Sequence, residues 1–248
     1  MLATRTLIVG AVTLVLTGAF MFARVFPAPT ACMFVGVAGF HVLSDGSLTD
    51  STSPDEQQRY LRLSVESRKR IANTFGEPEA KPIVVYLSRT NEFGFFKLNA
   101  FGSTQLLGSR ACVMIGPKGQ SVDVVAHELM HAEIHQRVGF WHRFMNIPTW
   151  FDEGLAMQVD YRPQYVLAAE EEHSKDTVRQ LTSSALFFNS DKKVVVSNYA
   201  KARALVADWV AKVGNASVYQ RLDQLRDGKS FEDVISMDQS RRVSTTHH

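Results

Sequence analysis

The stretch VVAHELMHAEIH constrains this chain more than any other part of its sequence. His127 and His131 stand four residues apart, and Glu128 directly follows the first histidine. On an α-helix, residues i and i+4 lie one turn apart on the same face, so both imidazoles can reach one point. A helix is expected here because Ser121 can cap its start and Gly139 can end it. The stretch therefore predicts a helix that directs two metal-binding nitrogens at one position.

A catalytic zinc site usually has three protein ligands, so a third is needed downstream. The metzincin arrangement fails, because Ile134 and Arg137 stand where it requires glycine and histidine. His135 lies about 12 Å along the helix axis from the first histidine, too far to share its metal, and we expect it on the surface. The remaining candidate is Glu153 in PTWFDEGLA, 22 residues after His131. That distance allows a second helix to run back beside the first and complete a His2Glu site.

The alternative is a solvated helix face on which the histidines have no joint role. Against it, HExxH followed by W-x-x-E-G-x-A is similar to the gluzincin zinc metallopeptidases, the thermolysin and aminopeptidase N group. IPTWFDEGLA most resembles the compact bacterial domains of peptidase-MA type. The resemblance implies one Zn²⁺ ion held by His127, His131 and Glu153, with Glu128 as general base. It also implies that Tyr199 stabilises the oxyanion, although Tyr199 could equally anchor its helix in the core.

The resemblance is uneven along the chain. It covers about residues 111–228 and is strong only over 125–156. The Gly-Ala-Met-Glu-Asn loop that holds the free amine in aminopeptidases is absent, and GSRACVMIGPKG stands in its place. A strand there could bind an extended peptide edge to edge. Aminopeptidase specificity is therefore not implied. Asp152, beside the predicted ligand, is expected either to support a ligand or to lie on the surface.

The N-terminus contains a long apolar run over residues 6–26, interrupted by Arg24 and a few threonines. As a helix it would be roughly 30 Å long, enough to cross a bilayer core. A cleaved signal peptide is the alternative, although no good small-residue cleavage site follows the run. Pro27 and Pro29 are expected to end this helix and begin a linker. We predict a membrane-anchored protein on the periplasmic side of a bacterial inner membrane, or a secreted one if the run is cleaved.

The cysteine content and the net charge bear on the redox compartment and on the possible partners. Cys32 and Cys112 could form a disulfide in an oxidising compartment, and the alternative is two separate buried thiols. The net charge is only +2, and no dense basic run is present, which gives no electrostatic basis for binding nucleic acid. The expected partners are a peptide or protein substrate and, through the N-terminal helix, the membrane. The sequence leaves the oligomeric state open.

The order of predicted elements indicates the fold class. A helix is expected to begin at Ser53 and stop at Gly76, and a β-branched strand is expected at 81–88. One or two more strands are expected over 93–116, the last of them at 111–115. Beyond the HExxH helix the pattern is mostly helical, which is typical of α+β folds. We therefore predict a zincin-like α+β fold with an N-terminal mixed sheet lobe and a mostly helical C-terminal lobe. The expected segments are an anchor with its linker over 1–30 and a metallopeptidase domain over 31–240, divided into a sheet lobe over about 31–120 and a helical lobe over about 121–240.

The predicted function is that of a zinc-dependent hydrolase, a gluzincin-type peptidase in which metal-activated water attacks the peptide bond and Glu128 is the base. Two alternatives stay open. One is a zinc hydrolase that acts on a substrate other than peptide. The other is a membrane-tethered binding or assembly module that keeps zinc for structure and has no turnover. Chelator-sensitive hydrolysis of casein separates the peptidase from the module.

Overall fold

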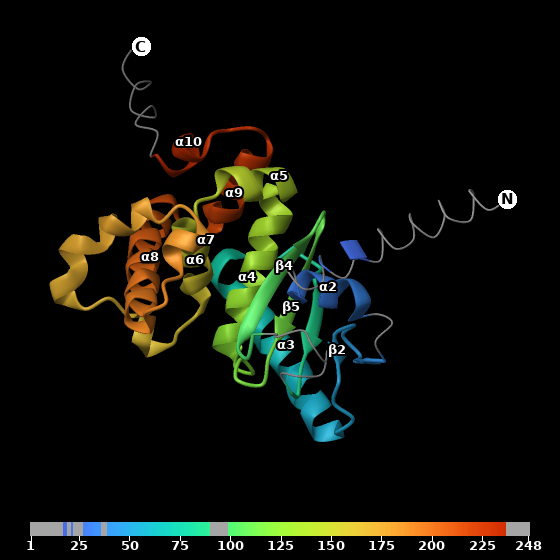
Figure 1. Ribbon diagram of the computed structural model, residues 1–248. Coiled ribbons are helices and arrows are strands. Elements are labelled where there is room, and N and C mark those ends of the chain that lie inside the picture. The colour runs from blue at the N-terminus through green and yellow to red at the C-terminus, as the bar shows by residue number, and fades with distance from the viewer. Residues whose placement is uncertain (1–16, 19–20, 22–26, 36–38, 90–98, 237–248) are drawn as a thin grey trace, which may run out of the picture.

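The computed structural model describes residues 17–18, 21, 27–35, 39–89 and 99–236. The predicted membrane-spanning run over 6–26 falls almost wholly outside these residues. Within the described ranges, no helix has the length and apolar character needed to cross a bilayer. The described residues form an N-terminal sheet followed by a mostly helical part (Figure 1), so the predicted α+β class is confirmed.

Among the described residues the sheet has five strands, in the order β1-β2-β3-β5-β4. Pairing is parallel between β2 and β3 and between β3 and β5, and antiparallel at the two ends of the sheet. The sheet is therefore mixed, as predicted. The strands span β1 His41–Val42, β2 Leu48–Thr49, β3 Ile83–Tyr86, β4 Gly102–Leu107 and β5 Arg110–Ile115.

The strand expected to offer its edge to a peptide lies inside the sheet. GSRACVMIGPKG forms β5, whose backbone pairs with β3 on one side and β4 on the other. Among the described strands, β4 is the one at this end of the sheet. A tight hairpin through Gly108, whose φ is 62°, joins the two. The sequence pattern marks both arms of a hairpin alike, so only tertiary pairing decides which arm is outermost.

The helices begin and end largely where the capping signals predict. In α3, the Ser53 side chain accepts from the backbone N–H of Glu56, and the helix ends at Gly76. In α4, Ser121 accepts from Val124 in the same way. The helices are α2 Pro27–Phe34, α3 Pro54–Phe75, α4 Val122–Val138, α5 Phe140–Asn146, α6 Thr149–Ala156, α7 Ser184–Phe187, α8 Lys192–Val213, α9 Val218–Arg226 and α10 Phe231–Ile235, with 3-10 turns at Met157–Val159, Pro163–Tyr165, Ala169–Gln180 and Asn215–Ser217.

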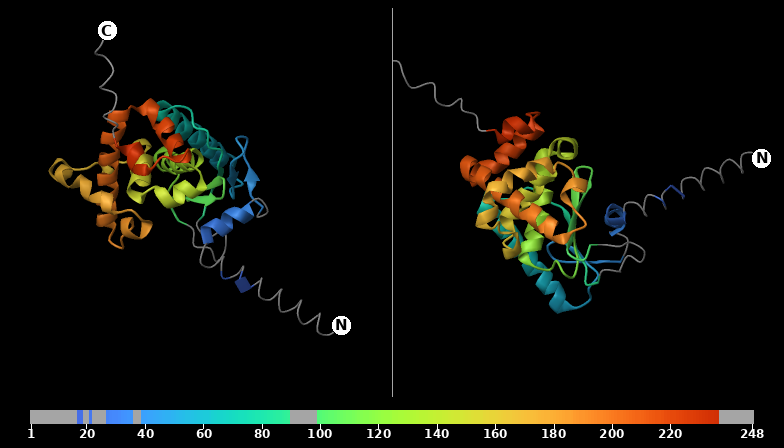
Figure 2. Two further views of the ribbon diagram at one scale, coloured as in Figure 1. Left: turned by 90° about the horizontal axis from the view of Figure 1, so that it is seen from above. Right: turned by 60° about the vertical axis from the view of Figure 1, so that its left-hand side comes forward.

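Helix α4 is the central element of the fold. It contacts β4 and β5 on one side and α3, α6 and α9 on others (Figures 1 and 2). Nearly all of its residues are buried, including most of the charged and polar ones. Gln136 is its one exposed residue, so α4 lacks the polar solvated face of a surface helix. The metal-binding motif therefore lies in the interior, between the sheet and the C-terminal helices.

The opposite face of the sheet is covered by α2. Side chains alternate along β5, so Val113 and Ile115 pack in the main core with α4, while Cys112 and Met114 face α2. The linker predicted to begin at Pro27 is wrong, because the residues Pro27–Phe34 are helical. Proline is well tolerated in the first turn of a helix, so the residue that ends one helix can equally start another.

A disulfide between Cys32 and Cys112 ties α2 to β5, so of the two alternatives for the cysteines the structure has the bridge. The bond closes a long loop, because the two cysteines are 80 positions apart in the sequence. Replacing both cysteines by serine is expected to lower the free energy of unfolding by about 2–5 kcal/mol. Urea denaturation of the oxidised wild type, the reduced wild type and the double variant measures this. An unchanged urea midpoint in the double variant would contradict the prediction.

Candidate metal centre

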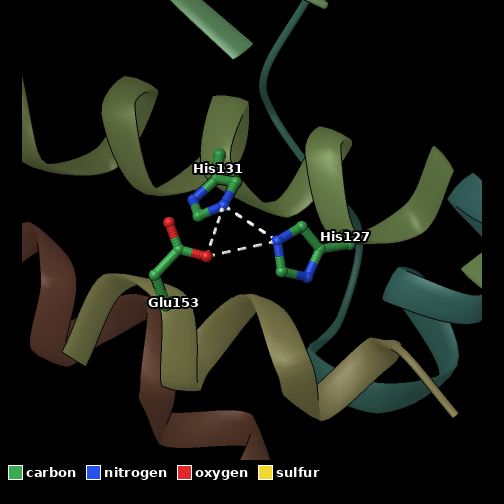
Figure 3. Close-up of side chains that lie close together, drawn as sticks. All are labelled: His127, His131 and Glu153. Atoms are coloured by element: carbon green, nitrogen blue, oxygen red, sulfur yellow. Dashed lines mark hydrogen bonds and ion pairs between the residues drawn. The ribbon is translucent and has the colours of Figure 1, made fainter. Parts of the chain in front are cut away.

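Helices α4 and α6 bring the three predicted ligands to one point (Figure 3). Nε2 of His127 lies 3.1 Å from Nε2 of His131, and Oε2 of Glu153 lies 3.4 Å and 3.5 Å from these two nitrogens. Tetrahedral zinc with bonds of about 2.0–2.1 Å separates its ligand atoms by about 3.3–3.4 Å. The three donor atoms thus have the spacing of a single metal site, and together they form a group that could hold one ion.

The chemistry of the triad also fits a cation. His127, His131 and Glu153 are 5%, 7% and 7% exposed. Oε2 of Glu153 is buried and accepts no hydrogen bond from the described residues, which is costly for a carboxylate oxygen. Burial raises the pKa of the Glu153 carboxyl, but attraction to the two imidazoles outweighs it and lowers the pKa overall. The triad therefore offers an anionic oxygen beside two nitrogens.

Asp152 supports the second histidine, which resolves the two alternatives for this residue. Nδ1 of His131 lies 3.1 Å from Oδ1 of Asp152, and the other carboxylate oxygen binds Arg143 of α5. Burial lowers the pKa of His131, but Asp152 and Glu153 raise it well above its usual value. When a metal displaces the proton of Nε2, the proton that Asp152 holds on Nδ1 would leave the Nε2 lone pair to bind the metal.

Asp160 has the corresponding place beside the first histidine. Its Oδ2 lies 3.6 Å from Nδ1 of His127, and the residue is fully buried. Arg162 binds both carboxylate oxygens, with Nε at 2.9 Å and 3.0 Å. Sequence reasoning missed this residue, because it follows a short 3-10 turn and nothing in its spacing marks it. Each histidine of the triad therefore faces an aspartate that an arginine holds in place.

Replacing Asp152 by asparagine is expected to weaken zinc binding about 10–100-fold, the effect typical of losing a carboxylate that orients a histidine ligand. The amide keeps the size of the side chain but removes the charge that favours a proton on Nδ1 of His131. Competition with a zinc-binding dye measures the Kd. The matched control is Asp176→Asn, an exposed aspartate paired with Arg179. Equal zinc affinities for Asp152→Asn and the control would contradict the proposed support.

The triad lies in a cleft of about 680 Å³, within the usual size range of ligand sites. Glu128 and Tyr199 both line this cleft, so all five predicted site residues lie around it. One wall comes from β4 and the residues before it, and the other from α5, α6 and the segment around α7. The remaining lining residues are Asn99, Gly102, Ser103, Thr104, Gln105 and Leu106 on the first wall, and Arg143, Ile147, Thr149, Asp152, Thr182, Ser183, Ser184 and Phe188 on the second.

Tyr199 on α8 borders the cleft and also packs against other aromatic side chains. Its ring lies 6.1 Å from the ring of His127 and borders the cleft, while Phe187 and Tyr165 pack against it. The pKa of its hydroxyl is well above the usual value, mainly because the group is buried and also because Glu153 and Glu128 are negatively charged. The hydroxyl therefore stays protonated at neutral pH and can act as a hydrogen-bond donor.

The expectation that His135 lies on the surface is wrong. The residue is 2% exposed, and its Nε2–H donates to the carbonyl of Gly108 at 2.8 Å. Burial lowers the pKa of this imidazole. His135 is separate from the metal triad, as its distance along the helix required. Its burial could not be read from the sequence, because it depends on the β4–β5 hairpin covering this end of α4.

Neither the protein-family models nor the curated proteins searched contain a match to this sequence. The resemblance to the gluzincins therefore rests on the motif itself. To that motif the structure adds an α+β fold and a buried His-His-Glu group with the dimensions of a metal site.

Proposed function

We propose that this protein is a zinc-dependent peptidase of gluzincin type. The observation that carries the proposal is the tetrahedral spacing of His127, His131 and Glu153, with Glu128 in the same cleft. A zinc ion with a purely structural role would need no general base beside it, so the presence of Glu128 in the cleft favours a catalytic site. A zinc ion bound to the triad would polarise the scissile carbonyl and lower the pKa of a water molecule.

The side chains around the triad have the remaining roles of peptide hydrolysis. Glu128 accepts the proton of the attacking water and then gives it to the leaving amine. The protonated hydroxyl of Tyr199 donates a hydrogen bond to the oxyanion. Strand β4 forms the cleft wall and lies at the end of the sheet, so an extended peptide can pair with its outer edge. This edge favours a polypeptide substrate over a small molecule.

The proposal places the protein outside the cytoplasm, held by a membrane helix over residues 6–26. The apolar run supports the anchor, and secretion after cleavage is the alternative. The disulfide between Cys32 and Cys112 supports an oxidising compartment. We further propose that residues 31–240 act as one metallopeptidase domain, because α4 packs against both the sheet and the C-terminal helices.

Metal analysis combined with casein hydrolysis tests the proposed function. Purified protein is expected to contain about one zinc per chain, the stoichiometry of a His2Glu site. It is also expected to cleave casein in a reaction that 1,10-phenanthroline stops and added zinc restores. Stoichiometric zinc without any casein turnover would contradict the peptidase and favour a binding or assembly module. Cleavage that the chelator does not affect would contradict the metal mechanism.

A further inference from the structure

A hydroxyl on strand β4 directly contacts the proposed base. Oγ1 of Thr104 lies 2.8 Å from Oε2 of Glu128 and 2.9 Å from the backbone carbonyl oxygen of the same residue. A threonine hydroxyl has one proton and can donate to one of these acceptors at a time. Both acceptors belong to Glu128, so the hydroxyl contacts this residue whichever of the two oxygens it donates to.

A glycine on the same strand makes room for the same side chain. A Cβ atom at Gly102 would lie 2.8 Å from both Cγ and Oε1 of Glu128, and 3.0 Å from Cγ1 of Val124. Contacts this short do not occur in real proteins, so any larger residue would displace the carboxylate or the strand. The side-chain amide of Asn99 donates to the Gly102 carbonyl at 2.9 Å and fixes this end of β4.

The sheet determines where these two residues lie. Positions 102 and 104 share one face of β4, because side chains alternate along a strand. In the β4–β5 pairing, Gly102 is opposite Ile115 and Thr104 is opposite Val113, and both partners are fully buried. Pairing with β5 therefore fixes the register of β4, and with it the positions of Gly102 and Thr104 beside α4. The orientation of the Glu128 carboxylate then depends on the sheet as well as on its own helix.

We infer that Thr104 is a positioning residue for the base, with Gly102 packed against the other side of the carboxylate. This inference rests on the proposed peptidase function. The hydroxyl holds Oε2 of Glu128 and, together with Gly102 beside Oε1, sets the orientation of the carboxylate in the cleft. Since the outer edge of β4 is also the proposed docking site for peptide, one strand sets the position of both the substrate and the base.

Replacing Thr104 by valine keeps the shape of the side chain and removes the hydroxyl. The kcat for casein is expected to fall about 10–100-fold, the cost typical of a base misplaced by about 1 Å. The apparent KM and the zinc content are expected to stay within about twofold of wild type, because neither substrate contacts nor ligands change. Thr104→Ser restores the hydroxyl and is expected to retain kcat within about threefold. Thr74→Val, which removes a hydroxyl bonded to the Arg70 carbonyl, is the matched control.

Crystal structures of zinc-loaded wild type and Thr104→Val give a readout independent of turnover. We expect the Glu128 carboxylate to bind Thr104 in the wild type and to leave that position in the variant. Wild-type kcat in Thr104→Val, or an unmoved carboxylate, overturns the inference. If the wild type itself cleaves no casein, the proposed function fails, while the position of Glu128 in the two crystals still decides the role of Thr104. Should Thr104→Val prove unstable, Thr104→Ala gives the same comparison without added bulk.

Discussion

Replacing Glu128 by glutamine is expected to lower casein hydrolysis about 1,000-fold or more, while zinc stays near one ion per chain. The amide has the size of the carboxylate but cannot take a proton from water, so the effect is on kcat rather than on binding. The hydroxyl of Thr104 can still donate to the amide oxygen, because the acceptor contacted at 2.8 Å is a side-chain oxygen. The fold and the triad are therefore preserved.

Steady-state kinetics and metal analysis on the same preparation check this result. Glu232→Gln is the matched control, since Glu232 is an exposed residue of α10 outside the cleft. The control is expected to cleave casein at the wild-type rate. Hydrolysis by Glu128→Gln at a rate close to that of the control would show that a group other than Glu128 is the base.

Replacing Glu153 by alanine is expected to weaken zinc binding by more than about 100-fold, a larger effect than loss of a supporting carboxylate. The variant removes the anionic donor, whose Oε2 lies 3.4–3.5 Å from the two imidazole nitrogens. Two imidazoles remain, and a third position opens to water. Because alanine is a good helix former, α6 is expected to persist.

Competition with a zinc-binding dye gives the Kd, and circular dichroism verifies that the helices are retained. Glu153→Gln separates charge from shape, and we expect it to bind zinc more weakly than wild type. His173→Ala is the control for a potential ligand outside the triad, since His173 is exposed on the 3-10 helix Ala169–Gln180. Zinc content that is unaffected by Glu153→Ala would rule out Glu153 as the third ligand.

The fold class could be predicted because its signals are local. The cap at Ser53 and the stop at Gly76 set the ends of α3, and the β-branched runs mark β3 and β5. The helix α2 was missed, because prolines usually interrupt helices and its packing against β5 is not visible in the local sequence. The place of β4 at the end of the sheet was missed too. Strand order depends on pairing between residues far apart in sequence, which local patterns do not contain.

For the metal centre, the sequence by itself determined the two histidines, because a spacing of four on a helix brings side chains together whatever surrounds them. It also indicated Glu153 as the candidate third ligand, on a second helix that runs back beside the first. Only the tertiary structure decided that Glu153 meets the histidines at ligand distance, that Asp160 lies beside His127 and that Thr104 contacts Glu128. These contacts join separate elements, so they exist only once α4 is enclosed between the sheet and the C-terminal helices.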